Sequence, residues 1–447
     1  MGHFEITDSL SIKEKLKRLG WKREEPDKRM NDLRNIFYED FYNFCFSSKI
    51  GRGIVAYEKA IDKTIQIRPA KRNVIPIKII GIKVFLLPFN MIMFYIEIEQ
   101  SEVVINDICF TNRCLRNIRK YKDLMDPWMR LAIRPLIDLY EEFNNKKGVG
   151  SRVDLVGRGN RLKTFQIIQL QNGEEHVLTD DMRKEQLYRL GTLTYYAGQD
   201  ETSEMSVTPQ HLNFIMEQNS IYVQKGWSAL ALLDTFTVVF YCDDVDSYMQ
   251  EFRSYCRTIY VHALFQKYYL FQLNQKHYDI QKKEITMTSY IKSLFPLGNS
   301  SIDLLAHDMR TFETKCSFNN IAYIYLPIMV HNYVSKGLQI EGEKQSIYNV
   351  VRAEKEEMED ISNKSINVIL LALSFFSLIS AILDGCVLIN SILPFGQWFS
   401  SESVGFALFS LLFICILMCV ILWFVIWGRR RSKRNQGSLI KPKLQNE

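Results

Sequence analysis

The chain has 447 residues, of which 47% are hydrophobic and 24% are charged, and its formal net charge is +6 at pH 7. This composition excludes a disordered protein, and the mild charge argues against a dedicated nucleic-acid binder. The charged first 34 residues argue against a secretory signal, and nine dispersed cysteines without a CxxC pair are typical of a reducing cytosol.

Residues 1–243 combine helix and strand patterns. The first 50 or so residues are predicted to be helical, most strongly at residues 31–46. Apolar and β-branched runs then predict three strands, with a turn at Pro88-Phe89-Asn90 before the last of them. These strands are expected at residues 74–80, 83–87 and 91–98. Helical patterns follow at residues 103–120 and 128–143.

A glycine-rich and basic stretch at residues 148–161 interrupts these patterns. The elements predicted after it are a strand at residues 164–170, a helix at 181–195, and strands at 221–223, 229–233 and 235–241. Because strands and helices mix throughout, we expect an α+β cytosolic domain over residues 1–243.

Residues 244–365 are predicted to form a stalk region of long helices. One helical pattern spans residues 246–283, residues 296–300 interrupt it, and a second pattern spans residues 302–325. Pro327 can open a third helix that continues toward residue 366. Gly337 and Gly342 are the positions at which this third helix can bend or break.

Two apolar runs follow, at residues 366–389 and 404–427, and Asp384 is the only charged residue in either. Each run exceeds the roughly 20 residues that a helix needs to cross a bilayer. Five arginines and lysines come directly after the second run, and such residues stay on the cytoplasmic side. We therefore predict two transmembrane helices over residues 366–427 of an inner or plasma membrane protein. A basic tail over residues 428–447 and both chain termini would be cytoplasmic.

The two membrane runs differ in polarity. The first carries a polar stripe on one side of its helix, whereas the second is apolar on all sides. The stripe consists of Asn367, Ser374, Ser377, Ser380 and Asp384. Because a carboxylate is costly against lipid, we predict that the stripe lines an aqueous pore, which requires an oligomer. The alternative is that the serines and the asparagine only help helices to pack.

Carboxylates are also clustered outside the membrane runs. Residues 354–360 hold five of them just before the first run, where they would concentrate cations at a pore mouth or form a solvated helix face. Asp243, Asp244 and Asp246 lie at a predicted helix start. They either cap that helix or bind a regulatory divalent cation such as Mg²⁺, which prefers oxygen ligands.

The glycine-rich stretch is the candidate site for an anion or a nucleotide. Its backbone N–H groups can approach a phosphate closely, and Arg152, Arg158 and Arg161 supply positive charge. The alternative is a flexible surface loop, because the stretch matches neither a Walker loop nor GxGxxG.

No catalytic constellation is recognisable in the sequence. The seven histidines are dispersed, and no HExxH, GxSxG or kinase motif is present. His262 and His277 lie in the long-helix region and are interpreted as packing or surface residues. We therefore expect that the chain is not an enzyme.

The order of these parts resembles the CorA family of divalent cation channels over nearly the whole chain. The family ends its first membrane helix with Gly-x-x-Gly-Met-Asn, and residues 385–390 here read Gly-Cys-Val-Leu-Ile-Asn. The first glycine and Asn390 match, whereas Leu388-Ile389 replaces Gly-Met. In the family this turn holds a hydrated magnesium ion at the outer entrance. The resemblance thus implies a share of that role for Asn390, an Mg²⁺-like permeant ion and a homopentamer.

Three functions remain open from the sequence. The first is an oligomeric membrane channel that conducts divalent cations through a pore lined by the first transmembrane helix. The second is a CRISPR-associated, CorA-like defence effector gated by a nucleotide second messenger bound to the cytosolic domain, a role to which the replaced Gly-Met is suited. The third is a membrane-anchored sensor or scaffold without conduction. The expected partners are further copies of the chain and the lipid bilayer.

Overall fold

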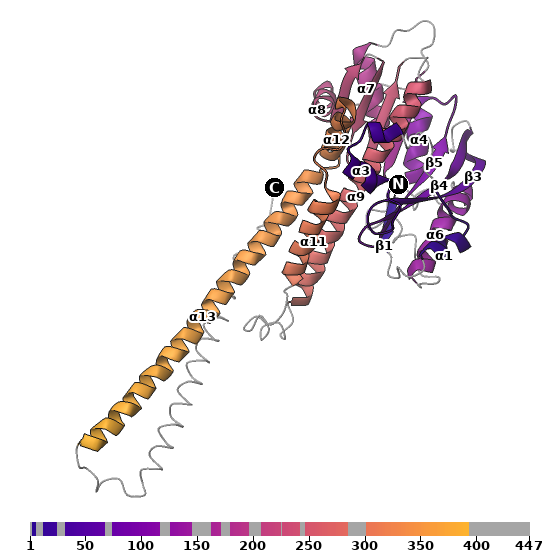
Figure 1. Cartoon of the computed structure of the whole chain (residues 1–447). Coiled ribbons are helices and arrows are strands. Elements are labelled where there is room, and N and C mark those ends of the chain that lie inside the picture. Colours follow the sequence, from indigo (N-terminus) through magenta and orange to yellow (C-terminus); the bar gives the residue numbers. More distant parts are fainter. Residues whose placement is uncertain are drawn as a thin grey trace. The chain divides into compact units, whose positions relative to one another are not determined.

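The computed structural model (Figure 1) describes residues 2–5, 12–24, 32–67, 74–116, 126–144, 162–170, 179–195, 207–224, 226–241, 246–284 and 301–392. The chain divides into two compact units, Met1–Glu359 and Asp360–Glu447. The first unit contains both β-sheets. The described part of the second unit is the continuation of α13 (Ile340–Ile392).

The first sheet is antiparallel throughout, with the strand order β1-β5-β4-β3-β2. Its strands are β1 (Gly2–Glu5), β2 (Lys22–Arg23), β3 (Val55–Ile67), β4 (Ile75–Leu87) and β5 (Met91–Glu99). Successive side chains of a strand face opposite sides of its sheet. Val84 and Phe94 accordingly pack into one core, and Phe85 and Tyr95 pack into another. The sheet is therefore covered on both faces.

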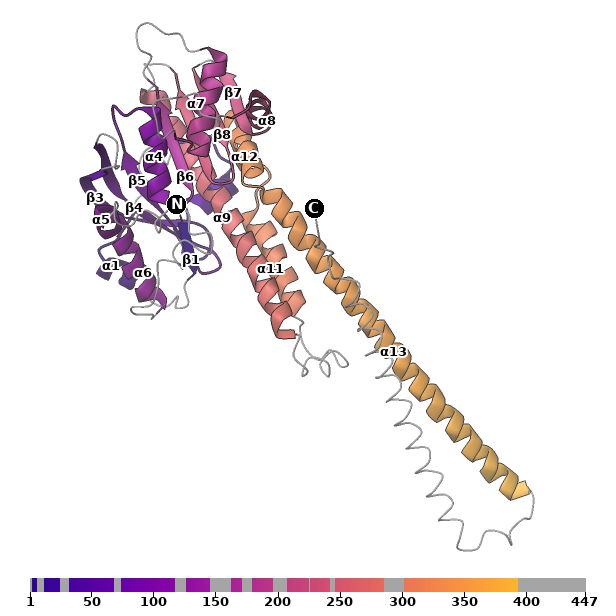
Figure 2. The same ribbon diagram turned by 180° about the vertical axis from the view of Figure 1, so that it is seen from behind.

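Helices from the N-terminal half of the chain cover the face of this sheet to which Val84 belongs. They are α1 (Ile12–Arg18), α4 (Ile105–Arg116), α5 (Asp126–Trp128), the π-helical turn η3 (Met129–Ile133) and α6 (Arg134–Asn144). Leu16 of α1, Leu136 of α6 and Ile77 of β4 are all completely buried in this core. Figure 2 shows the same elements from behind.

The second sheet is mixed and has the strand order β6-β9-β8-β7. Its strands are β6 (Thr164–Gln169), β7 (Ser220–Gln224), β8 (Trp227–Ala231) and β9 (Thr235–Phe240), and only β6 and β9 run parallel. On one face, α7 (Asp180–Thr192) and α8 (Pro209–Asn219) pack against Leu230 and Val239. Gly191 permits this approach, because a Cβ atom there would lie 2.4 Å from Leu230 Cδ2.

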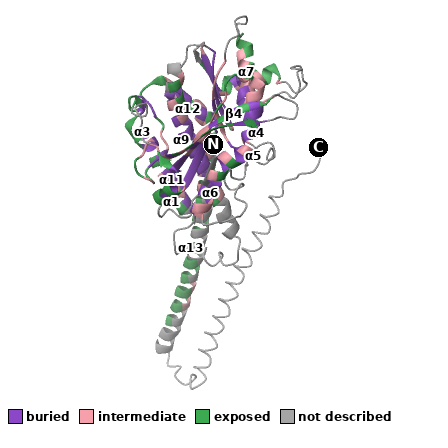
Figure 3. Cartoon of the chain, turned by 90° about the vertical axis from the view of Figure 1, so that its right-hand side faces the viewer, coloured by how far each residue is buried: buried purple, intermediate pink, exposed green. Residues whose placement is uncertain are grey.

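The other face of each sheet packs against the helices of the C-terminal half of the first unit. These are α9 (Asp246–Glu284), α11 (Ser301–Cys316), α12 (Tyr325–Gly337) and the beginning of α13. Phe252, Tyr260 and Phe265 of α9 are completely buried, and Figure 3 shows the buried residues of this unit in purple. An ion pair between Lys267 and Glu343 joins α9 to α13.

Several predicted elements are confirmed. The helix predicted at residues 246–283 is α9, and the helix predicted at 181–195 is α7. The turn at Pro88-Phe89-Asn90 joins β4 to β5, with Phe89 and Asn90 at φ angles of 62° and 56°. The strands predicted at 74–80 and 83–87 are a single strand, β4, which has a bulge between Ile79 and Gly81.

Two helix predictions are wrong for a shared reason. Within residues 31–46, η1 (Leu33–Asn35) and α3 (Glu39–Cys45) are short helices separated by non-helical residues 36–38, and the helix predicted to reach residue 325 ends at Cys316. The intervening segments pair with each other. Tyr38 N donates to the Ile321 carbonyl at 3.0 Å, and Tyr323 N donates to the Ile36 carbonyl at 2.8 Å. This long-range pairing replaces local helical hydrogen bonds.

The third predicted helix is divided. α12 ends at Gly337, where a Cβ atom would lie 2.5 Å from the Ala231 carbonyl oxygen, and α13 begins at Ile340. Gln339 has a φ angle of 58°, a left-handed conformation that a continuous helix does not permit. Gly342 lies inside α13 and does not interrupt it. The helix therefore breaks at one of the two predicted glycines.

Candidate functional site

α13 is an uninterrupted helix of 53 residues, about 80 Å long at about 1.5 Å per residue. All five residues of the polar stripe lie on it and are exposed: Asn367, Ser374, Ser377, Ser380 and Asp384. The Ser374 hydroxyl donates to the Leu370 carbonyl at 2.8 Å. Asn390 also lies on α13, but its side chain lies outside the described residues. At about 100° per residue, Asn390 falls outside the arc of the other five.

Helical geometry divides residues 374–385 by size and polarity. At about 100° per residue, an arc of roughly 140° holds only small or polar residues. They are Ser374, Ser377, Ser380, Ala381, Asp384 and Gly385. The rest of the circumference holds only large apolar residues. They are Phe375, Phe376, Leu378, Ile379, Ile382 and Leu383. The polar arc of such a helix is suited to contact with water or a partner helix, and its apolar remainder is suited to an apolar medium.

Large apolar side chains of α13 are exposed in the described structure. Leu371, Leu373 and Phe376 are 64%, 59% and 54% exposed. Among the residues that the structure describes, no helix combines the length and the apolarity of a membrane span. The side chains of residues 368, 372, 382, 383 and 385–390 are outside that set, as is the second apolar run at residues 404–427.

The acidic region before the stripe includes a local ion pair on α13. Arg352 Nε lies 2.9 Å from Glu356 Oε1, one helical turn further along α13, and both side chains are largely exposed. This contact is typical of a solvated helix face, one of the two interpretations of residues 354–360.

A second candidate site is a cleft of about 1870 Å³ in the first unit. Its walls come from the Tyr95–Glu99 half of β5, from β6, from α4 and from the beginning of α9. In the described part of the chain, β6 pairs only with β9, and this half of β5 pairs only with β4. Two strand edges therefore border the cleft.

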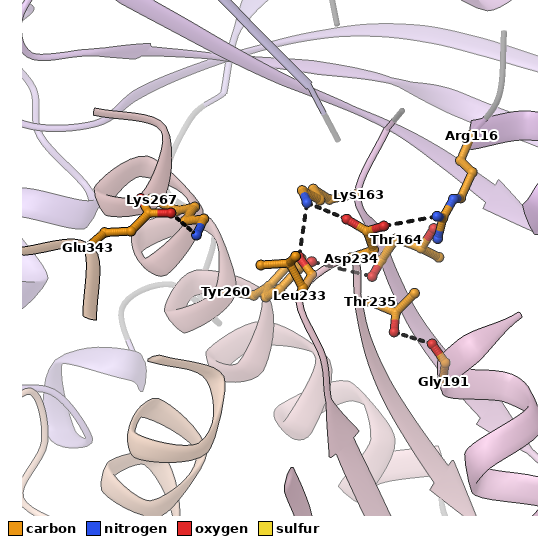
Figure 4. A network of polar contacts seen from close by, with 10 residues as sticks. All are labelled: Arg116, Lys163, Thr164, Gly191, Leu233, Asp234, Thr235, Tyr260, Lys267 and Glu343. Atoms are coloured by element: carbon orange, nitrogen blue, oxygen red, sulfur yellow. Dashed lines mark hydrogen bonds and ion pairs between the residues drawn. The ribbon is translucent and has the colours of Figure 1, made fainter. Parts of the chain in front are cut away.

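One wall of the cleft holds a compact ion-pair network, drawn in Figure 4. Asp234, in the turn between β8 and β9, binds Arg116 of α4 at 3.0 Å and also forms an ion pair with Lys163. Lys163 donates to the Leu233 carbonyl at 3.0 Å as well. Both cationic side chains are more than four-fifths buried and line the cleft. One carboxylate thus holds two cations from different elements at the cleft wall.

α9 supplies two more cations to the cleft. Arg253 forms an ion pair with Glu97 of β5, and Arg257 Nη1 donates to the Tyr95 hydroxyl at 3.2 Å. Among the described residues, no carboxylate forms an ion pair with Arg257. Its guanidinium therefore keeps donors available for a further acceptor.

Carboxamide side chains also line the cleft. Gln166 of β6 accepts from Asn112 at 2.7 Å and donates to the Leu190 carbonyl at 2.8 Å, so it is held firmly. In contrast, some buried polar atoms of the lining, among them Gln100 Nε2, Gln186 Oε1 and Trp128 Nε1, have no hydrogen-bond partner in the described structure. Such atoms are destabilising unless a ligand or water completes their bonding.

The predicted ligand residues are not located by the structure. Arg152, Arg158, Arg161, Asp243 and Asp244 lie outside the described residues, and Asp246 is the first residue of α9, with a side chain that is not described. Within the described chain, no group of three His, Cys, Asp or Glu side chains is arranged to hold a metal ion. Leu162, which directly follows Arg161, lines the cleft.

Sequence analysis did not identify the cleft residues Arg116, Lys163 and Arg257, or Asp234, which binds the first two. Of these four residues, Lys163 was the easiest to predict from the sequence, because it follows the basic stretch by two residues and precedes a predicted strand. The other three are far apart in the sequence and meet only through the fold. No local pattern marks them.

Two buried histidines lie where α9, α11 and α12 meet. His262 is completely buried, contacts the rings of Phe41 and Phe44, and donates through Nε2 to the Cys316 carbonyl at 2.9 Å. Burial lowers the pKa of His262 to about 3 and that of His331, whose ring centroid is 6.2 Å away, to about 4. The packing interpretation of His262 is confirmed. Nothing described for His277 tests its interpretation.

Comparison of the chain with models of protein families, with curated proteins and with solved structures finds no match. No family is thereby assigned to the chain.

Proposed function

We propose that the chain is the subunit of an oligomeric membrane channel that conducts divalent cations, with α13 lining the pore. The observation that carries this proposal is the division of residues 374–385 into a small, polar arc and a large, apolar remainder on one uninterrupted helix. The proposal further includes two membrane crossings per chain, with residues 404–427 as the outer helix, and cytoplasmic termini.

The exposed apolar side chains of α13 require a cover. Removing a leucine or phenylalanine side chain from water stabilises a protein by roughly 1.5–3 kcal/mol, and several such side chains of α13 are more than half exposed. Lipid or neighbouring copies would supply this cover. Asp384 has the opposite requirement, since a carboxylate at the centre of a bilayer costs at least ~2.5–3.5 kcal/mol. An arrangement with the polar arc inward and the apolar side outward satisfies both.

The need for an oligomer and the preference for cations are both inferred from the polar arc. A single arc of roughly 140° cannot enclose a water-filled path, so several copies are needed. A ring of Asp384 carboxylates would attract cations, and divalent ions most strongly. Five copies and an Mg²⁺-like ion are what the resemblance to the CorA family implies. Residues 354–360 would add a negative potential before the pore.

Ion flux into liposomes that contain the full chain tests this function. We expect Mg²⁺ or Co²⁺ uptake by the wild-type chain. Asp384→Asn removes the ring of charge and should lower divalent flux about tenfold while monovalent flux is retained. Phe375→Leu is the matched control, because at about 100° per residue Phe375 lies on the side of the helix opposite Asp384, and this variant should conduct as the wild type does. Absence of flux from a correctly assembled wild-type oligomer would favour a sensor or scaffold without conduction.

A second candidate function is a channel opened by a nucleotide, as in the defence effector considered above. The cleft of the first unit favours it, because its cations and unpartnered carboxamides suit a bound ligand. Flux measured with and without a nucleotide distinguishes the two functions. Opening by depletion of Mg²⁺ alone would exclude nucleotide gating.

A further inference from the structure

The cleft of the first unit lies between two sheets that share the same covering helices. α9 packs into the core that holds Tyr95 of the first sheet and Phe236 of the second. α4 packs into the core on the opposite face of the first sheet through Phe110, and into that of the second sheet through Cys109. The two sheets therefore lie edge to edge between α4 and α9, and the cleft separates the edge of β5 from the edge of β6.

The edge of β6 directs unpaired backbone groups into this cleft. On the β9 side, Thr164 N donates to the Asp234 carbonyl at 2.9 Å. Because adjacent residues of a strand direct their backbone groups to opposite edges, Phe165 and Ile167 direct theirs toward the cleft. Neither has a backbone partner there among the described residues. On the facing strand β5, the pairing with β1 ends at Phe94. Such open edges are the positions at which an extended segment adds to a sheet.

The dimensions of the cleft suit one extended segment. Its lining includes all six residues of β6, a length of about 20 Å at about 3.3 Å per residue. Its volume of about 1870 Å³ exceeds the roughly 300–1,000 Å³ that is usual for a small-molecule pocket. A segment of about six or seven residues would follow the whole edge of β6.

One face of such a segment would meet apolar side chains. Successive residues of a strand point to opposite faces of the sheet, so every second side chain of the segment would point toward α4. The lining on that side includes Ile96 and Ile98 of β5, Ile168 of β6 and Ile108 of α4. We therefore expect apolar residues at alternate positions of the segment.

The other face would meet the polar side chains of α9. The carboxylates of the lining are Glu97, Glu99 and Glu102. Glu97 forms an ion pair with Arg253. Glu99 lies 4.0 Å from Lys78. Arg257, by contrast, forms no ion pair with any described residue. One cation on the α9 side is therefore left for an acidic side chain of the segment.

From these features we infer that the cleft between β5 and β6 binds an extended peptide by strand addition, with apolar side chains toward α4 and one acidic side chain toward Arg257. The bound segment would pair with both edges and join the two sheets into one. This inference goes beyond the proposed channel and does not depend on ion conduction. A strand in the cleft would compete with the nucleotide considered above.

Fluorescence anisotropy of a labelled peptide with the detergent-solubilised full chain tests the inference. The probe is the seven-residue peptide Val-Thr-Val-Glu-Val-Thr-Val, acetylated and amidated at its ends. We expect saturable binding. A peptide with lysine in place of glutamate should bind at least tenfold more weakly, because it places a cation against Arg257. A peptide with N-methyl groups at its three even-numbered residues should also bind at least tenfold more weakly, because it cannot donate to one of the two edges.

Variants of the chain test the same two contacts. Arg257→Gln should weaken the probe about tenfold, and Arg257→Lys should restore part of that loss, whereas Lys63→Gln at an exposed position of β3 is the matched control. Ile167→Pro removes the N–H group that faces the cleft, and proline is tolerated where a strand edge is unpaired. This variant should weaken the probe about tenfold. Ile167→Ala keeps the N–H group and should bind within about threefold of the wild type.

Three results would overturn the inference. The first is absence of saturable binding of the probe to the wild type. The second is equal binding of the N-methylated and the unmodified peptide, or of Ile167→Pro and Ile167→Ala, since backbone pairing would then have no part. The third is binding that weakens as the concentration of the chain is raised, since a second copy would then occupy the cleft. Ion flux enters none of these measurements.

Discussion

α9 and α13 are both long helices, with 39 and 53 residues, but their large side chains have opposite environments. On α9, Phe252 and Phe265 are completely buried, whereas on α13 Leu371 and Phe376 are more than half exposed. The core of the first unit therefore buries large aromatic side chains of α9. Among the described residues, the large apolar side chains of α13 after residue 366 are largely exposed and call for a cover.

This difference indicates that the two helices have different roles. α9 organises the first unit, since both sheets and the helices α11 and α12 pack against it. Among the described residues, the last members of that core on α13 are Tyr348 and Val351, and the later part of α13 carries the polar arc. Substitutions on α9 are thus expected to change stability, and those on the later part of α13 are expected to change assembly and conduction.

The largest expected effect is loss of a buried aromatic ring of α9. Phe265→Ala removes a ring that contacts Phe44, Tyr269 and Phe312, and should lower the free energy of unfolding by about 3–5 kcal/mol. Phe376→Ala on α13 should leave the unfolding of the first unit within about 0.5 kcal/mol of the wild type. Chemical denaturation followed by near-ultraviolet circular dichroism measures both. Equal losses would contradict the division between the two helices.

A smaller effect is expected from acid acting on the helix junction around α9. Burial lowers the pKa of His262 to about 3 and that of His331 to about 4, whereas histidine in the unfolded chain has a pKa near 6.5. Between these values the unfolded chain binds more protons than the folded chain. Stability is therefore retained above about pH 6.5 and falls as the pH is lowered, by about 1.4 kcal/mol per pH unit for each histidine.

Denaturation at several pH values between 4 and 8 measures this slope. His331→Gln should make the slope shallower by about one proton, and the exposed His211→Gln on α8 is the matched control. The charged groups near the pair include Lys344, which lies on α13 and further lowers both pKa values. A slope that His331→Gln leaves unchanged would show that this histidine does not titrate with unfolding.

Two glycines on neighbouring helices provide an intermediate test. At Gly337 of α12, a Cβ atom would lie 2.5 Å from the Ala231 carbonyl oxygen, so Gly337→Ala should destabilise the chain by about 1–3 kcal/mol. At Gly342 of α13, nothing lies within 4 Å of such an atom. Gly342→Ala should therefore stabilise the helix by about 0.5–1 kcal/mol. Thermal unfolding of both variants should give shifts of opposite sign.

Long elements with a strong pattern were predictable from the sequence. α9 has apolar residues at helical spacing over its whole length, and β4 and β5 alternate around a recognisable turn. β3 was missed because charged residues occupy its exposed positions and hide the alternation. α8 was missed although Thr208 caps it and Pro209 opens it, which is a recognisable start signal.

The two candidate sites differ in how far the sequence reveals them. The stripe on α13 is local, so helical periodicity alone brings its residues to one side. The cleft joins Arg116, Lys163, Asp234 and Arg257 through two sheets and two helices. Its residues are brought together by strand pairing and packing over more than a hundred positions, which no local pattern encodes.

The smallest effect is expected where α13 is exposed and polar. Arg352 and Glu356 form an ion pair one helical turn apart, but their side chains are 81% and 65% exposed. Water and salt screen such a pair, so Glu356→Gln should change the free energy of unfolding by only about 0.3–0.5 kcal/mol. If residues 354–360 instead act on passing cations, the same variant should lower divalent flux at low ionic strength. Flux measured at two salt concentrations, compared with unfolding of the same variant, decides between a solvated helix face and a pore vestibule.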